Sequence, residues 1–151
     1  MSGVAISVLV ASRGPAARLR RLLDSLAVQT VEHETLVVDN GSAGSEVSEL
    51  CSDYPFASAL RLEANEGFSR PVNLAARRAQ GDVIVLVNDD CVCEPAFAEA
   101  IAAAIDPASG IVMGAGVMRD HREPALIDTA GMQLDPTLLV YDYLNGEPLS
   151  A

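Results

Sequence analysis

The sequence predicts an α/β fold with three layers, α/β/α, around a mostly parallel central sheet. Short runs of Val, Ile and Leu alternate with segments of helical periodicity along most of the chain. Hydrophobic residues make up 50% of the sequence but aromatic residues only 4%, so aliphatic side chains must form the core, as is usual in parallel sheets covered by helices. A length of 151 residues fits one domain, predicted over 1–151.

The predicted elements follow the order βαβαβαβαβ, which favours a parallel sheet with helices on both faces. The first helix is the clearest, because Leu19, Leu22, Leu23 and Leu26 recur at helical spacing and Pro15 suits the first helical position. The predicted strands span 4–11, 35–38, 57–62, 83–87 and 110–117, and the predicted helices span 15–26, 44–52, 69–79 and 94–105. From 120 to 150 the pattern weakens to loop structure that can hold a hairpin, with short apolar pieces near 125–127 and 138–141.

The charge and cysteine content exclude several classes of protein. A formal net charge of −11 repels nucleic acid and anionic membrane surfaces. No apolar run reaches the roughly 18 residues of a membrane span, and the sequence does not begin like a signal peptide. Cys51, Cys91 and Cys93 form neither a disulfide framework nor a zinc motif, so reduced, buried thiols are expected. We therefore predict a cytoplasmic protein, with a membrane-peripheral position and a homo-oligomer left open as alternatives.

The most informative segment is 83–90. Its apolar residues 83–87 predict a strand buried on both faces, and Asn88, Asp89 and Asp90 follow at the carboxyl end, where open α/β sheets bind ligands. Adjacent carboxylates repel each other unless a cation lies between them. Oxygen ligands favour Mg²⁺ or Mn²⁺, which commonly bridges to substrate phosphates. The segment therefore predicts a site for a metal ion and a diphosphate.

Polar residues also follow two other predicted strands. Ser12 and Arg13 end the first strand, and Asp39 and Asn40 end the second. Since parallel strands end at one edge of the sheet, we expect Asp39 and the doublet at 89–90 to face a common hollow. A carboxylate after an early strand suits a ribose or a base edge, which predicts a nucleotide-sugar site. The alternatives are an Asx turn at Asp39 and a solvated turn at the doublet.

These residues resemble family 2 glycosyltransferases with the GT-A fold. The resemblance covers about residues 4–148, and Thr129-Ala130-Gly131 is similar to a segment of the rhamnosyltransferase-like branch. The other matching segments are Ile6-Ser7-Val8-Leu9-Val10, Leu22-Leu23-Asp24-Ser25-Leu26 with Gln29-Thr30, Val37-Val38-Asp39-Asn40-Gly41-Ser42, Asn65-Glu66-Gly67-Phe68, Asn73-Leu74-Ala75, Ala79-Gln80-Gly81-Asp82 and Asn88-Asp89-Asp90.

The resemblance implies a role for each matching position. Asp39 would contact the nucleobase or ribose, and Ser12 would line the same nucleoside pocket. Asp90 would be the direct metal ligand, with Asp89 beside it facing the ribose or donor sugar. The remaining candidates for donor binding are Arg13, Asn40, Asn65, Arg70 and Asn88. The alternatives are surface charge for Arg13 and Arg70, the latter at a position where the family usually has a small residue, and a structural role in the loop for Asn65.

The resemblance also implies the reaction. A hexosyl or rhamnosyl group would pass with inversion from a UDP, dTDP or GDP sugar to the hydroxyl of a carbohydrate, lipid-linked or protein acceptor, in polysaccharide biosynthesis. Mg²⁺ or Mn²⁺ would stabilise the diphosphate leaving group. The chain departs from the family at Asn88, where an acidic residue is usual, and at Ala75, where glycine is usual.

The largest departure from the family lies at the end of the sequence. No segment resembles the acceptor-binding half that carries the general base, so the C-terminal part of the fold is predicted to be missing. Glu123, Asp128 and Asp135 are candidates for the base by location alone. The chain is thus predicted to be the N-terminal, donor-binding part of such an enzyme. The alternative is a non-catalytic module that binds a nucleotide or nucleotide sugar.

Overall fold

The computed structural model describes residues 6–150, which form two compact units divided between Ala103 and Ala104. The predicted strand positions 4 and 5 lie outside the described residues. That the whole chain acts as a single domain stays a prediction. The first unit contains β1 (Ile6–Ser12), α1 (Ala16–Leu26), β2 (Glu34–Asn40), α2 (Glu46–Ser52), β3 (Ala57–Leu62), α3 (Ser69–Ala76), β4 (Val83–Leu86) and most of α4 (Phe97–Ala104).

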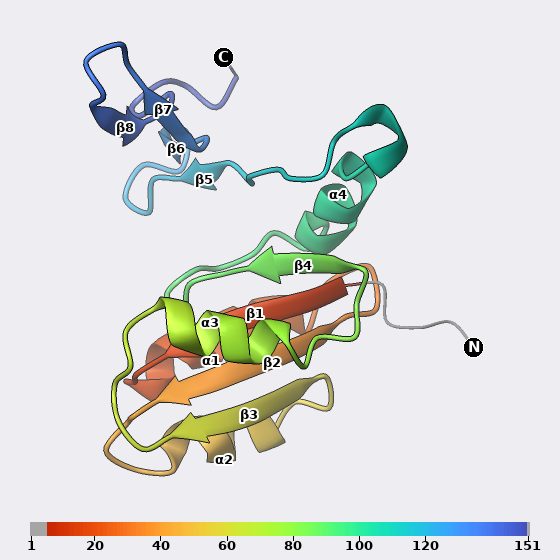
Figure 1. Ribbon diagram of the computed structural model, residues 1–151. Helices are drawn as coiled ribbons and strands as arrows, with labels where there is room; N and C mark the ends of the chain where they lie inside the picture. Colours follow the sequence, from red (N-terminus) through yellow and green to blue (C-terminus); the bar gives the residue numbers. More distant parts are fainter. Residues whose placement is uncertain (1–5, 151) are drawn as a thin grey trace. The chain divides into compact units, whose positions relative to one another are not determined.

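The four strands of the first unit form one parallel sheet, in the order β3-β2-β1-β4. Ser12 on β1 is paired with Asp39 on β2, and Asp39 is paired in turn with Arg61 on β3. The carboxyl ends of the strands therefore lie at one edge of the sheet (Figure 1). This parallel sheet with flanking helices confirms the predicted fold class.

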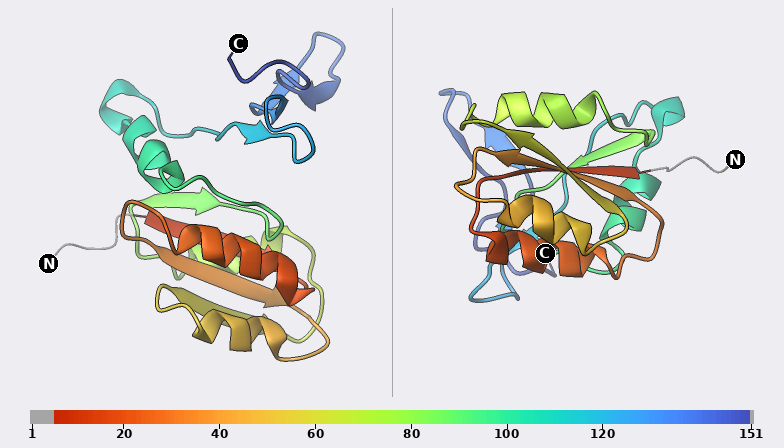
Figure 2. Two further views of the ribbon diagram at one scale, coloured as in Figure 1. Left: turned by 180° about the vertical axis from the view of Figure 1, so that it is seen from behind. Right: turned by 90° about the horizontal axis from the view of Figure 1, so that it is seen from below.

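Helices cover both faces of the sheet, as the right-hand view of Figure 2 shows with the sheet seen edge-on. On one face, α1 and α2 pack against the alternate side chains of β1 and β2, and Phe97 and Ile101 of α4 contact the same cluster. On the other face, α3 covers Leu9 of β1 and Leu36 and Val38 of β2. Successive side chains of a strand point to opposite faces of the sheet, so apolar residues on both faces allow helices to pack on each side and give three layers.

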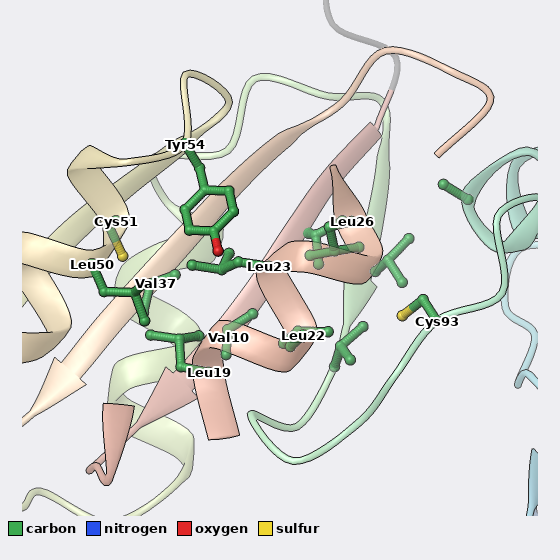
Figure 3. Close-up of a cluster of buried hydrophobic side chains, with 14 of the residues drawn as sticks. Val10, Leu19, Leu22, Leu23, Leu26, Val37, Leu50, Cys51, Tyr54 and Cys93 are labelled. Atoms are coloured by element: carbon green, nitrogen blue, oxygen red, sulfur yellow. The ribbon is translucent and has the colours of Figure 1, made fainter. Parts of the chain in front are cut away.

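The larger core lies between the sheet and α1 (Figure 3). Leu19, Leu22, Leu23 and Leu26 are all fully buried there, which confirms the predicted leucine stripe. Tyr54 closes the cluster near α2 and donates its hydroxyl hydrogen to Asp24 Oδ1 at 2.6 Å. This packing fixes the strands whose ends carry the candidate site.

The prediction that the strand at 83–87 is buried on both faces is wrong. In β4, Val85 is buried, but Ile84 and Leu86 keep 51% and 47% of their surface exposed. The physical reason is position: β4 is an edge strand of the sheet, and α3 packs on β1 and β2. Hydrophobicity alone does not reveal whether a helix covers the second face of a strand.

The second unit contains the 3₁₀ helix η1 (Pro107–Ser109) and four short strands. They are β5 (Met118–Arg119), β6 (Ile127–Thr129), β7 (Met132–Leu134) and β8 (Val140–Asp142). The antiparallel pairing of β7 with β8 confirms the expected hairpin, and β5 pairs with β6.

The prediction of a strand over 110–117 is wrong. Ile111 instead bonds back to Asp106 across a turn in which Gly110 has φ of 88°. Residues 112–117 belong to no described strand, and Val112 and Met113 are 72% and 85% exposed. An apolar run forms a strand only where a neighbouring strand pairs its backbone.

None of the helices within residues 6–150 has the length and hydropathy that a bilayer crossing requires.

Candidate functional site

The candidate site begins with a hydrogen bond between two strand ends. Ser12, the last residue of β1, donates its hydroxyl hydrogen to Asp89 Oδ2, just beyond β4, at 2.7 Å. Ser12 is also the register partner of Asp39 on β2. The structure therefore brings together the ends of all three strands that the sequence singled out, with Ser12 in the middle.

Asp39 is fully buried, and both of its carboxylate oxygens are engaged by the protein. Oδ1 accepts a hydrogen bond from the backbone N–H of Ser42 at 2.9 Å, and Oδ2 accepts one from Arg61 Nη1 at 3.1 Å. The bond to Ser42 has the form of an Asx turn, the alternative considered for this residue. Asp39 therefore fixes the loop that follows β2.

Arg61 holds the same loop from β3. Its guanidinium donates to the backbone carbonyls of Gly44 and Ser42, the latter at 3.0 Å, in addition to Asp39. Sequence reasoning missed Arg61, since its proximity to Asp39 depends on the register of β2 with β3. A single sequence gives no signal for that register.

Asn40 ties the end of β2 to the loop before α3. Its amide donates to Asn65 Oδ1 at 3.0 Å and to the carbonyl of Gly67 at 2.7 Å, and its side-chain oxygen accepts from the N–H of Glu66 at 2.9 Å. Asn65 also accepts from the N–H of Gly67. The two asparagines are thus brought together, and they shape the loop.

The two arginines predicted in donor binding are both exposed. Arg70 Nε forms an ion pair with Glu66 Oε2 at 2.5 Å, four residues earlier. Sequence reasoning missed Glu66, although a spacing of four at a helix start was an available signal. Arg13 lies in the loop between β1 and α1 and lines a pocket.

That pocket has a volume of about 370 Å³. The β1–α1 loop contributes Arg13, Gly14 and Pro15 to its lining, and the β2–α2 loop contributes Ser42, Ala43 and Gly44; Glu46 and Val47 of α2 complete it. Neither Asp39 nor the acidic doublet lines this pocket. Asp39 instead supports its wall through Ser42.

Gly41 explains why the wall has a fixed position. Its φ is 79°, and a Cβ atom there would lie 2.5 Å from the backbone carbon of Ala64. Only glycine allows this close approach between the loops after β2 and β3.

The acidic doublet fits a divalent cation that is shared with a ligand. Asp89 is partly buried and held by Ser12, whereas Asp90 and Asn88 are exposed. Within residues 6–150, no group of three or more His, Cys, Asp or Glu side chains gathers around one point. Mg²⁺ sites, however, often use one or two carboxylates and take their other ligands from phosphates and water. Asp89 and Asp90 have the chemistry for that kind of site.

All three thiols are free, and burial raises their pKa values. Burial first, and then the charge of Asp39, raise the pKa of Cys51 to about 11. Burial, followed by the charge of Cys91, raises the pKa of Cys93 to about 11 as well. For Cys91, burial and then the charge of Asp90 also raise the pKa. These protonated thiols match the expected packing role.

The candidates for the general base all lie in the second unit. Glu123 and Asp128 are exposed. Asp135 Oδ1 accepts hydrogen bonds from Thr137 and from the N–H of Leu139, and these bonds lower its pKa. Asp135 therefore stabilises a turn.

Comparison with known proteins decides the family. The model of the family described as "Glycosyl transferase family 2" matches residues 7–129. The chain belongs to glycosyl transferase family 2. An uncharacterized glycosyltransferase of Haemophilus influenzae is 30% identical over 102 residues, covering 67% of this chain and 34% of that protein. The uncharacterized glycosyltransferase YwdF of Bacillus subtilis is 31% identical over 105 residues, covering 68% and 39%.

Solved structures of TarS share the fold of this chain. The crystal structure of TarS residues 1–349 from S. aureus superposes with a TM-score of 0.61 at 27% identity, covering 69% of this chain and 33% of that one. Crystal structures of TarS have also been determined in complex with UDP and with UDP-GlcNAc. The chain thus spans about a third of the length of these relatives.

Proposed function

We propose that this chain is the N-terminal, donor-binding part of a family 2 glycosyltransferase. The donor is a nucleotide-diphosphate sugar, and the sugar, of hexosyl or rhamnosyl type, passes to an acceptor hydroxyl with inversion. The observation that carries this proposal is the Ser12–Asp89 hydrogen bond. It holds one carboxylate of the doublet at the ligand-binding edge of the sheet and leaves exposed Asp90 beside it.

In this proposal Asp90 and Asp89 hold Mg²⁺ or Mn²⁺. When bound, the cation offsets the charge that develops on the diphosphate as the bond to the sugar breaks. Ser12 orients Asp89, because its hydroxyl fixes one of the two carboxylate oxygens. Asn88 and Arg70 line the path of the diphosphate, and Arg70 first exchanges Glu66 for the phosphate.

The nucleoside occupies the pocket between the β1–α1 and β2–α2 loops, beside Arg13. Asn40 and Asn65 hold the next loop that borders the site. Buried Asp39 influences the nucleoside through the loop that it fixes. TarS, a relative of similar fold, is known in complex with UDP-GlcNAc, which supports a UDP sugar as the first donor to test.

A cytoplasmic or membrane-peripheral location and a role in polysaccharide biosynthesis are part of the same proposal. A carbohydrate, lipid-linked or protein acceptor fits it. The second candidate function is a module that binds a nucleotide or nucleotide sugar without catalysis. It is favoured by one observation: Asp135, a candidate for the general base, is engaged in a turn by Thr137 and Leu139.

Two measurements test these proposals. Calorimetry with UDP, dTDP and GDP, each with and without Mn²⁺, should show metal-dependent binding of at least one nucleotide; no binding of any of them contradicts the proposed function. A sensitive assay of UDP-GlcNAc hydrolysis or transfer then separates the two candidates, because a module binds the donor without turnover.

A further inference from the structure

We propose that Arg61 is a positioning residue of the nucleotide pocket: it holds the β2–α2 loop in the conformation that binds the nucleoside and does not touch the ligand itself. This inference rests on the proposed function. It concerns a residue on β3, away from the motifs that mark the family in the sequence.

The guanidinium of Arg61 makes several contacts with a single loop. Arg61 Nη1 donates to Asp39 Oδ2 at 3.1 Å and to the Gly44 carbonyl, while Nη2 donates to the Ser42 carbonyl at 3.0 Å. Arginine offers several N–H donors in a rigid planar fork, which suits three acceptors in fixed positions. The fork therefore joins the end of β2 to both carbonyls of the loop.

Arg61 also offsets the charge of Asp39. The Asp39 side chain is 0% exposed, whereas that of Arg61 is 44% exposed. A buried carboxylate is costly without a cation, and its removal from water is offset here by an ion pair and by the N–H of Ser42. Asp39 and Arg61 together thus hold both peptide groups that flank Ser42, through its N–H and its C=O.

The loop that Arg61 holds forms part of the wall of the pocket. Ser42, Ala43 and Gly44 form one part of its lining, but Arg61 is not among the lining residues. The Ser42 hydroxyl is buried and has no hydrogen-bond partner in the part of the chain that the structure describes. Buried hydroxyls are normally satisfied, so this oxygen is a group that a polar atom of a ligand can pair with. Arg61 fixes the backbone on which that hydroxyl is carried.

The test compares uridine with UDP, because a positioning residue and a phosphate ligand affect them differently. In Arg61→Ala, the affinities for uridine and UDP should fall by the same factor, about tenfold, since the loop loses its preorganisation for both ligands. Uridine is measured by competition against UDP. Arg61→Lys keeps the charge but not the fork, so it should lose less affinity than Arg61→Ala, again equally for both ligands.

Arg78→Ala is the matched control, because it removes one exposed positive charge. Arg78 lies just after α3, toward the amino ends of the strands and away from the candidate site at their carboxyl ends. It should leave both affinities unchanged. Circular dichroism establishes which variants are folded, and Arg61→Lys carries the test if Arg61→Ala unfolds.

Three results would overturn the inference, and they are distinguishable. A loss for UDP alone in the Arg61 variants means that Arg61 contacts phosphate. Unchanged affinities in folded variants, with only a lower melting temperature, mean that Arg61 is structural. If the wild-type chain binds neither ligand, the proposed function itself fails and this inference fails with it.

Discussion

The Ser12 hydroxyl and Asp89 Oδ2 lie 2.7 Å apart, although the two residues are 77 positions apart in the sequence. One belongs to the first strand of the sheet, and the other follows β4, the neighbouring edge strand. Because the strands are parallel, this contact can form only at their carboxyl ends. It places an oriented carboxylate at the edge where α/β sheets bind ligands.

Replacing Ser12 by alanine should weaken nucleotide binding more than it weakens the fold. The variant loses the bond that orients Asp89, so we expect the affinity for UDP in the presence of Mn²⁺ to fall about tenfold, as for other groups that support a metal ligand. Ser58→Ala, on the exposed side of β3, is the control for the loss of a serine hydroxyl. Equal affinities of the two variants in calorimetry would show that the Ser12–Asp89 bond does not serve the site.

Asn40→Ala should lower the free energy of unfolding by about 2–3 kcal/mol, because it removes the three hydrogen bonds that one buried side chain makes. Asn73→Ala, on an exposed position of α3, should be neutral or slightly stabilising, since alanine favours helix. Urea denaturation measures both. A similar small change in the two variants would mean that the network contributes little.

Gly41→Ala and Gly67→Ala separate close approach from backbone strain. Both glycines have positive φ, 79° and 75°, so alanine strains both. A Cβ at Gly41 would overlap the backbone of Ala64, whereas a Cβ at Gly67 meets open space. We expect Gly67→Ala to cost about 1 kcal/mol of stability and Gly41→Ala clearly more. Thermal denaturation of the two variants measures this difference. An equal loss of stability in both would contradict the close approach of the loops after β2 and β3.

The stability of the fold should fall as the pH rises from about 9 to about 11. Burial raises the pKa of the Cys51 and Cys93 thiols from the ordinary 9.0 of an unfolded chain to about 11 in the fold. Between these values the unfolded state binds fewer protons, so rising pH favours unfolding, whereas below 9.0 the full stability remains. The raised pKa of Tyr54 acts in the same direction, and no lysine in the chain complicates the titration.

Urea denaturation at pH 7, 9 and 10.5 measures this dependence, and the Cys51→Ala and Cys93→Ala variants should each reduce its slope. A slope that is the same in the wild type and both variants would show that these thiols do not cause it.

Local pattern predicted most of the first unit. The strand over 57–62 was predicted with the bounds that β3 has, and the leucine stripe of α1 is buried as expected. These features depend on periodicity and turn residues, which a single sequence contains. That Ser12 and Asp89 lie near each other was also predictable in general terms, because the carboxyl ends of parallel strands lie at one edge of the sheet.

The remaining features depend on which elements lie next to each other. Ile84 is exposed because β4 is an edge strand, and Arg61 meets Asp39 because β2 and β3 pair in one particular register. Residues 112–117 show the same limit, since an apolar run forms a strand only beside a partner. Which elements lie next to each other, and in which register strands pair, depends on the whole chain. The residues of one segment therefore do not predict these features.

The most direct test of the central claim is a calorimetric titration of UDP into the chain with and without Mn²⁺, in the wild type and in Asp90→Ala. Asp82→Ala is the control, because it removes an exposed carboxylate just before β4, at the amino end of that strand. We predict that Mn²⁺ strengthens UDP binding at least about tenfold in the wild type and in Asp82→Ala, and that Asp90→Ala abolishes this gain. A gain that persists in Asp90→Ala, or wild-type affinity that does not depend on Mn²⁺, would contradict a metal–diphosphate site at the acidic doublet.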